Sequence, residues 1–304
     1  SWTCGLFQFH PKEGGAFHRR PDLFLNPKDQ NFVDIKHVCK QNDSTFWYAT
    51  SHFLAGESGK RTFTIRPGGW TKEIIQENYF HKTLVAKNGV IWAGSRSGIV
   101  KIDPKTGQYH KVMLAEIASP YSNQTSDVII DISEAPNGDI WFLRNMGGKD
   151  YVLGFTVLRK GSNQWVTYLA GQGKFAGYPF PQSAHRLIAT SEGSIFVTGE
   201  RGLVRFSGTN PDQFTSYTSF NGLAADACFD AEEDKFGTVW VAGSGSLSSL
   251  TMKSNRWRTY TALDGLPDAF VQSLSKLDNG QVVITHSEHW LTILNPEKLL
   301  LYRV

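Results

Sequence analysis

Charged, amide and imidazole side chains recur at comparable points along the chain, each at or soon after a run of β-branched and aromatic residues. These candidate ligand-binding residues are Arg96, Arg144, Asn145, His185, Arg201, His286 and Glu288. Guanidinium groups that converge on one point would bind a carboxylate or a sulfate through paired hydrogen bonds. Aromatics such as Tyr121, Tyr178 and Phe180 could stack on sugar faces. The alternative for any single arginine is a solvated ion pair with a neighbouring acid.

The segment His286-Ser287-Glu288-His289 holds residue types that bind metal ions. In a strand, however, residues 286 and 288 share a face while 289 points away, so ordinary loop polarity is the preferred interpretation. The chain shows no nucleophile elbow, phosphate-cradling loop, HExxH motif or spaced Cys/His set. We therefore expect no catalytic residue, no metal and no cofactor, and a binding role instead.

Bulk properties exclude several classes of protein. Of 304 residues, 40% are hydrophobic and 19% charged, which is ample for a buried core. A net charge of +3 is too small for a nucleic-acid-binding surface. No stretch of about 18 apolar residues exists, so we expect no membrane span within the chain. No charged-then-apolar leader opens it, so any signal peptide has been removed or never existed.

The three cysteines, Cys4, Cys39 and Cys228, fit neither a paired zinc site nor a dense disulfide framework. A bridge between Cys4 and Cys39 is an open alternative in an oxidising compartment. Single buried thiols are common, however, and they are the interpretation we prefer.

One unit recurs: an aromatic anchor inside a β-branched run, three residues after a turn glycine. The anchors are Trp92, Trp141, Phe196 and Trp240, with Val283 in a copy that loses the aromatic, Trp47 in one that loses the glycine, and Trp2 in one that lacks its upstream half. Successive anchors lie roughly 43–55 residues apart, close to the length of a four-stranded propeller blade. This spacing predicts one blade per anchor.

Each repeat predicts four strands. Examples are 127–132 for the first strand, 98–102 for the third and the aromatic run 165–168 for the fourth, while the anchor lies on the second. Asn-Gly pairs such as Asn88-Gly89 predict the first hairpin turn, with positive φ at both residues. The fold class is therefore all-β, a seven-bladed β-propeller of four-stranded blades forming a single domain over 1–304. A six-bladed ring with an extra amino-terminal segment is the alternative. An open β-sandwich would have no reason to repeat one unit at one period.

The predicted loops differ widely in length. Long loops are predicted at 51–60, 114–127, 144–152 and 169–182, and the blade pattern assigns all four to one face. Long loops are often functional, so we place the binding face there. Tolerated drift in loop length is the alternative.

Several segments resemble the two-component regulator propeller repeat, found in the periplasmic sensor domains of bacterial hybrid two-component systems. They are 260–268 (YTALDGLPD) followed by 278–280 (DNG), 218–223 (TSFNGL), and the run from 91–94 (IWAG) to 102–107 (IDPKTG). The resemblance implies a periplasmic or extracellular module that senses a ligand, often a glycan, for a downstream kinase. The implied partners are a glycan or other small molecule and the rest of a membrane-spanning sensor kinase, with no nucleic acid; a homodimer stays open.

Kinase, transmembrane and DNA-binding segments are not part of this chain. It is therefore either a piece of a longer sensor or a stand-alone relative. Two other functions stay open. One is a metal-dependent lyase or hydrolase similar to the propeller lyases that open cyclic antibiotics, with His185, Glu200, His286 and Glu288 as the nearest equivalents by blade position. The other is a protein-interaction scaffold.

Overall fold

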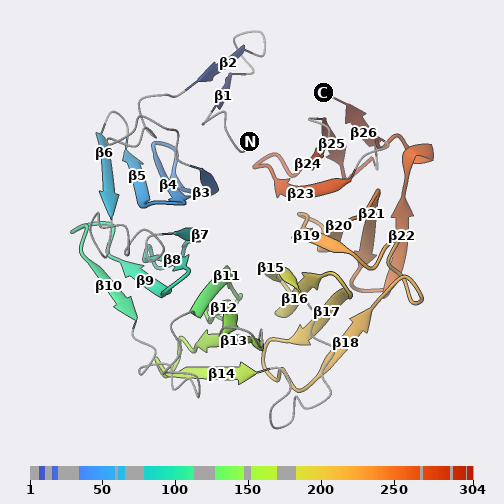
Figure 1. The fold of residues 1–304 in the computed structure, drawn as a ribbon. Coiled ribbons are helices and arrows are strands. Elements are labelled where there is room, and N and C mark those ends of the chain that lie inside the picture. Colours follow the sequence, from blue (N-terminus) through green and yellow to red (C-terminus); the bar gives the residue numbers. More distant parts are fainter. Residues whose placement is uncertain are drawn as a thin grey trace. The chain divides into compact units, whose positions relative to one another are not determined.

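Six four-stranded sheets, here called blades, follow one another along the chain (Figure 1). The structure is a computed structural model that describes residues 7–10, 16–19, 34–58, 61–65, 79–112, 127–146, 152–169, 183–267, 270–287, 290–298 and 300–303. In every blade, strands that are consecutive in sequence are neighbours in the sheet. The described residues are thus almost entirely β, with one 3-10 turn at Ala262–Asp264.

The first three blades contain β3 (Ile35–Asn42), β4 (Thr45–Thr50), β5 (Leu54–Ser58) and β6 (Arg61–Ile65); β7 (Phe80–Val85), β8 (Ile91–Ser95), β9 (Gly98–Ile102) and β10 (Tyr109–Val112); and β11 (Asp127–Glu134), β12 (Ile140–Met146), β13 (Val152–Leu158) and β14 (Trp165–Leu169). The last three contain β15 (Ala184–Ala189), β16 (Ser194–Gly199), β17 (Gly202–Ser207) and β18 (Phe214–Tyr217); β19 (Cys228–Glu233), β20 (Thr238–Gly243), β21 (Ser246–Thr251) and β22 (Arg256–Tyr260); and β23 (Val271–Lys276), β24 (Val282–His286), β25 (Leu291–Asn295) and β26 (Leu300–Arg303).

The prediction of seven blades is wrong, and the alternative count of six is confirmed for the described residues. The chain upstream of Trp47 supplies β1 (Phe7–His10) and β2 (Ala16–Arg19), which pair with each other as a two-stranded sheet. Trp2 lies outside the described residues. Among the described residues, the chain before β3 thus forms only this two-stranded sheet and no seventh four-stranded blade.

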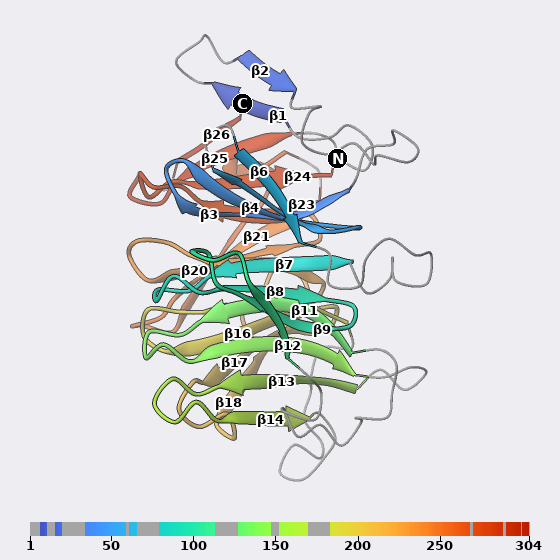
Figure 2. The same ribbon diagram turned by 90° about the vertical axis from the view of Figure 1, so that its left-hand side faces the viewer.

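The contacts divide the chain into two compact units. Unit 1 comprises Ser1–Ile132 and Arg144–Tyr151, and unit 2 comprises Ser133–Leu143 and Val152–Val304. In unit 1, β7 packs against β3 and β4, so the two blades are neighbours (Figure 2). In unit 2, β19 packs against both β15 and β23. Within each unit, the first strands of successive blades thus lie side by side.

The aromatic anchors form the cores, as the repeat predicts. Trp47 packs with Phe80 and Ile91 between two blades of unit 1. In unit 2, Trp240 is 1% exposed and its indole nitrogen donates to Asp234 at 2.8 Å. Each blade leaves large apolar faces that the next blade covers, which is how repeat architectures are stabilised.

The first hairpin turns differ from the prediction. Only the glycines have positive φ, for example Gly89 at 84°, while the preceding asparagines do not. The amide of Gly89 donates to the carbonyl of Ala86, and that of Val90 to the Asn88 side chain. This is a type I turn followed by a left-handed glycine, in which the asparagine acts through its side chain instead of its backbone conformation.

One predicted loop is a strand. Residues 54–58 of the expected loop 51–60 form β5, and only a tight turn at 51–53 precedes it. The hydroxyl of Thr50 donates to the carbonyl of Phe53 at 2.6 Å and closes this turn. Most of the other three predicted long loops, together with Tyr121, Tyr178 and Phe180, lies outside the described residues.

Cys39 and Cys228 are free thiols. Burial raises the pKa of Cys39 to about 11 and that of Cys228 to about 12, so both are poor nucleophiles. Cys4 lies outside the described residues.

Among the described residues, no helix has the length and apolar character needed to cross a membrane.

Candidate functional site

A short stretch of backbone is repeated where the first strand of a blade begins. In five blades, the amide just after the second strand donates to the carbonyl of a residue just before or at the start of the first strand's segment. These bonds join Ser51 to Asp34, Arg96 to Tyr79, Glu200 to Ser183, Ser244 to Ala227 and Ser287 to Phe270. We call this region the strand-start corner of a blade.

A β-bulge adds a third residue to each of these corners. The register of the first strand shifts by one residue at Lys36, His81, His185, Phe229 and Gln272. A bulge removes a residue from the regular ladder and re-aims its side chain, and bulges are common beside functional sites. Each corner therefore presents three side chains of variable type: one before the strand, one on the bulge and one on the turn.

In unit 1, two corners combine into a cluster of cations around one aromatic ring. The guanidinium carbon of Arg96 lies 4.0 Å from the centre of the Tyr79 ring, and Lys36 Nζ lies 5.4 Å from it. The imidazole of His81 is 4.8 Å from the same ring, tilted by 45°. We call Lys36, Tyr79, His81 and Arg96 the unit 1 cluster.

The electrostatics of this cluster are set by its positive charges. Burial opposes the charge on Lys36, but a hydrogen bond with Tyr79 and the nearby Asp34 carboxylate outweigh it and raise the pKa of Lys36. Lys36 Nζ and Asp34 Oδ2 are 3.5 Å apart. Burial, together with the charges of Arg96 and Lys36, lowers the pKa of His81 to about 4. The imidazole is therefore neutral at pH 7.

One ring nitrogen of His81 is enclosed without a partner. Its Nε2 is buried and accepts or donates no hydrogen bond among the described residues. Nδ1 is the nitrogen that remains for a ligand. With two full cations beside it, one of them shared with Asp34, the cluster can bind an oxyanion.

The matching corner of unit 2 carries the opposite charge. His185 occupies the bulge as His81 does, but Glu200 stands on the turn where Arg96 stands in unit 1. Burial lowers the pKa of His185, while Glu200 acts to raise it. The imidazole lies 5.9 Å from the Phe229 ring on the next bulge.

The structure brings one of the predicted ligand-binding residues, Arg96, into a cluster, and it places His185 at the matching corner. Arg201 is exposed on the turn after β16. Tyr178 and Glu288 lie outside the described residues. Their roles in binding stay predictions.

Two predicted residues, Arg144 and His286, are buried inside their blades. Both lie three residues after an anchor, where Thr50 and Ser95 are also buried. His286 Nε2 is 2.9 Å from the Thr292 hydroxyl. The residue one position later is less enclosed: Arg96 and Glu200 are exposed on the turn, and Asn145 is half-buried near the end of β12. Since successive side chains alternate between faces, one position separates the interior from the corner.

Sequence reasoning missed Lys36, Tyr79 and His81. The signal that could have found them is their fixed distance upstream of the anchors. Lys36 and His81 occupy the same place in the repeat, as do His185 and Phe229. Comparing the repeats at this fixed distance from their anchors would have shown a position that varies freely in side-chain type.

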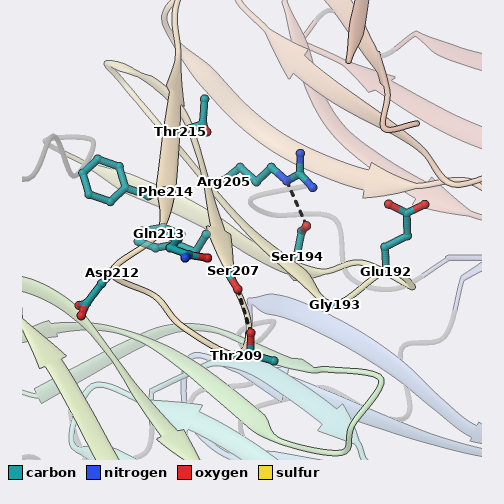
Figure 3. Close-up of a pocket in the computed structure, with 11 residues that line it drawn as sticks. Glu192, Gly193, Ser194, Arg205, Ser207, Thr209, Asp212, Gln213, Phe214 and Thr215 are labelled. Carbon is teal, nitrogen blue, oxygen red and sulfur yellow. Dashed lines mark hydrogen bonds between the residues drawn. The ribbon is translucent and has the colours of Figure 1, made fainter. Parts of the chain in front are cut away.

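Unit 2 also has an open hollow of about 680 Å³ at the hairpin end of the β15–β18 blade (Figure 3). Arg205 Nε donates to the Ser194 hydroxyl at 3.0 Å on its wall. Figure 3 shows Arg205 and Phe214 pointing to opposite sides of β17 and β18. The polar and aromatic groups do not converge on one point, so the unit 1 cluster is the stronger candidate site.

No group of three or more His, Cys, Asp or Glu side chains within the described ranges could hold a metal ion.

Comparison with known proteins identifies the fold class. No family model and no curated protein sequence matches the chain. Among solved structures, the extracellular domain of a hybrid two-component system from B. thetaiotaomicron aligns with a TM-score of 0.66 and 18% identity over 89% of this chain. A catalytically inactive virginiamycin B lyase from Staphylococcus aureus, solved with quinupristin, aligns with a TM-score of 0.67 and 13% identity over 92% of this chain and 86% of its own.

A gluconolactonase from Xanthomonas campestris aligns with a TM-score of 0.54 and 10% identity over 86% of this chain and 82% of its own. The chain is thus a β-propeller, a fold that it shares with sensor domains and with enzymes. It spans 36% of the length of the two-component sensor structure. At these identities the likeness concerns the fold and does not select among the functions.

Proposed function

We propose that this chain is an extracytoplasmic ligand-binding β-propeller of a two-component type sensor, and that the unit 1 cluster binds an anionic group of its ligand. The observation that carries the proposal is the convergence of Lys36, Arg96 and His81 on the ring of Tyr79. The sensor-type repeat motifs and the fold shared with a sensor's extracellular domain support it. The propeller would lie outside the cytoplasm, and its partner would be the rest of a membrane-spanning sensor kinase.

The chemistry of the cluster favours binding a charged ligand. Arg96 and Lys36 repel each other and disfavour a charge on His81, and Asp34 offsets only part of this excess. Arranging like charges together costs free energy, and functional sites are where such arrangements concentrate. A carboxylated or sulfated sugar, or a small oxyanion, would relieve the repulsion through charge-assisted hydrogen bonds.

The test is thermal stabilisation by a matched panel of ligands. Sulfate, glucuronate and a sulfated disaccharide should raise the Tm by a few degrees at saturation, and a neutral disaccharide should not, because only a ligand of the folded state stabilises it. Arg96→Ala should lose the shift. Arg256→Ala, which removes an exposed arginine of β22, should keep it. If no anion in the panel raises the Tm of the wild-type protein, the proposal fails.

A metal-dependent lyase is the second candidate, and the observation that favours it is that Glu200 lies close enough to His185, at one corner of unit 2, to act on the charge of its imidazole. An imidazole and a carboxylate are common ligands of divalent cations. The enzyme hypothesis expects the purified protein to retain a divalent cation that His185→Ala loses. The protein would be purified in buffer that contains a divalent cation and then analysed for metal. If no cation is bound, the lyase hypothesis is wrong.

A further inference from the structure

We propose that the unit 1 cluster takes up an oxyanion together with one proton, and that the bound anion holds this proton on His81. The inference rests on the proposed function, because it concerns how the same cluster binds. It names the ligand group as an oxyanion of one or two charges, such as a sulfate, a sulfate ester or a phosphate monoester.

The surroundings of His81 make its charge depend on a ligand. The charged groups that act on it are Arg96, on the turn after β8, and Lys36, on the bulge of β3. Tyr79, just before β7, contacts its ring without a formal charge. No carboxylate acts directly on His81 among the described residues, since Asp34 pairs with Lys36.

An anion in the cluster reverses this balance. In its absence, burial and two cations keep the imidazole neutral, with a pKa of about 4. A negative charge within about 4 Å of Nδ1 offsets the repulsion and accepts a hydrogen bond from the protonated ring. The cluster then carries three cations and the Asp34 carboxylate, a net positive charge of two that matches a dianion. The proton comes from the solvent, and no bond within the protein breaks.

The enclosure of His81 Nε2 leaves Nδ1 as the nitrogen at which a protonated ring can bind a ligand. A proton on Nε2 has no partner among the described residues, so the imidazolium gains hydrogen bonding only at Nδ1. A ligand oxygen at Nδ1 is therefore what the charged form lacks. The protonated ring is stabilised by a bound anion, and the neutral ring is favoured in its absence. Anion binding and protonation of His81 are therefore coupled thermodynamically.

Unit 2 supplies a matched control. His185 occupies the same place in the repeat and its pKa is also lowered by burial, but the neighbouring turn carries Glu200 instead of arginine. No cation–aromatic cluster surrounds it among the described residues. His185 should therefore not couple to anion binding.

The experiment is calorimetric titration of the whole chain with sodium sulfate, which does not itself titrate near neutral pH. Sulfate affinity should rise at least tenfold from pH 7 to pH 5, since one linked proton changes affinity by up to tenfold per pH unit. Titrations in two buffers of unlike ionisation enthalpy should show uptake of up to one proton per sulfate. His81→Asn should bind at pH 7 but lose the rise, and His185→Asn should keep it.

The outcomes separate this inference from the proposed function. Sulfate that binds with the same affinity at both pH values overturns the proton uptake and leaves the anion site standing. A rise that persists in His81→Asn places the proton elsewhere and also overturns it. Failure of sulfate and the sulfated disaccharide to bind at any pH overturns both.

Should His81→Asn not fold, NMR of the wild-type imidazoles decides. The His81 ring resonance should titrate near pH 4 without sulfate and at about pH 6 or above with saturating sulfate, the midpoint that a tenfold rise in affinity requires. An unchanged midpoint overturns the inference.

Discussion

In both units, the residue directly after the bulge of a first strand forms an ion pair with the next blade. The side chains at the strand-start corner beside this ion pair differ between the units. Directly after the bulge, Lys82 of β7 pairs with Asp131 of β11 at 3.0 Å in unit 1. In unit 2, Arg186 of β15 pairs with Asp230 of β19, also at 3.0 Å. One position in the repeat therefore joins neighbouring blades by a cation and a carboxylate in both units.

The bulge and the turn beside this position differ. Unit 1 has His81 next to Arg96, and unit 2 has His185 next to Glu200. The paired residues lie between blades, where a change disturbs packing, while the bulged residue leaves the ladder. The contact between blades therefore restricts the residue type at the position after the bulge. It leaves the bulged position open to different residue types, and a binding site can form there.

The largest expected effect concerns the ion pair between blades. Lys82→Ala should lower the free energy of unfolding by about 3–5 kcal/mol, because it leaves the Asp131 carboxylate buried without its cation. The two side chains are 9% and 2% exposed. Arg186→Ala should cost less, about 1–3 kcal/mol, because the side chains of Arg186 and Asp230 are 22% and 11% exposed, so water screens the carboxylate that remains. Urea unfolding measures both.

Lys82→Arg is the control for charge, and it should retain most of the stability that Lys82→Ala loses. Equal losses for the two alanine variants would contradict the view that the unit 1 pair is the more enclosed one.

The sequence predicted the strands better than the site. The turn glycines and the anchors at Trp92, Trp141, Phe196 and Trp240 located each second strand, because burial on both faces of a blade demands large apolar residues there. The blade count was wrong because Trp2 matches an anchor in residue type, while the described strands before β3 form only a two-stranded sheet. A residue pattern shows which side chains can be buried, but it does not show which strands are present to pair into a sheet.

The site was predictable only in part, for two physical reasons. A bulge has no residue signature of its own, so nothing in the sequence marked Lys36 or His81 as leaving the ladder. Lys36 and Tyr79 also belong to different blades, and only the packing of β3 on β7 brings them together. Arg144 and His286 are buried, while the residue after each second strand lies at the corner, because one position along a strand exchanges one face for the other.

The second prediction uses acid to compare the two histidines. His81 binds a proton near pH 6.5 when unfolded and near pH 4 when folded, so the unfolded state binds more protons between these values. Stability should therefore fall as pH drops through this window, by up to about 3 kcal/mol. His81→Asn should flatten the fall between pH 6.5 and 4.5 in urea unfolding. His185→Asn should flatten it less, because Glu200 offsets part of the burial.

Wild-type and His81→Asn proteins that lose stability equally over this range would show that His81 is not held neutral by its corner. Sodium sulfate offers a second check. If the anion holds a proton on His81, saturating sulfate should reduce the acid-induced loss in the wild-type protein and not in His81→Asn.

The third prediction exchanges the turn charges. Arg96→Glu gives unit 1 the turn charge of unit 2, and sulfate affinity should fall about 10–100-fold through loss of a charge-assisted contact. The same change should raise the pKa of His81, measured by NMR, because the carboxylate favours the imidazolium. Glu200→Arg should lower the pKa of His185 without creating a sulfate site, since Ser183 stands where Tyr79 stands in unit 1. Sulfate binding that survives Arg96→Glu undiminished would place the anion outside this corner.

The smallest expected effect tests the freedom of the bulge itself. Gln272 is the exposed bulged residue of β23, and its neighbour Leu274 is 2% exposed in the core. Gln272→Ala should change the free energy of unfolding by less than about 0.5 kcal/mol, the usual range for surface substitutions. Leu274→Ala, two residues along the same strand, should cost about 2–5 kcal/mol by leaving a cavity. A large loss for Gln272→Ala would mean that bulged side chains fasten blades as their neighbours do, and the variety at this position would then need a structural cause instead of a functional one.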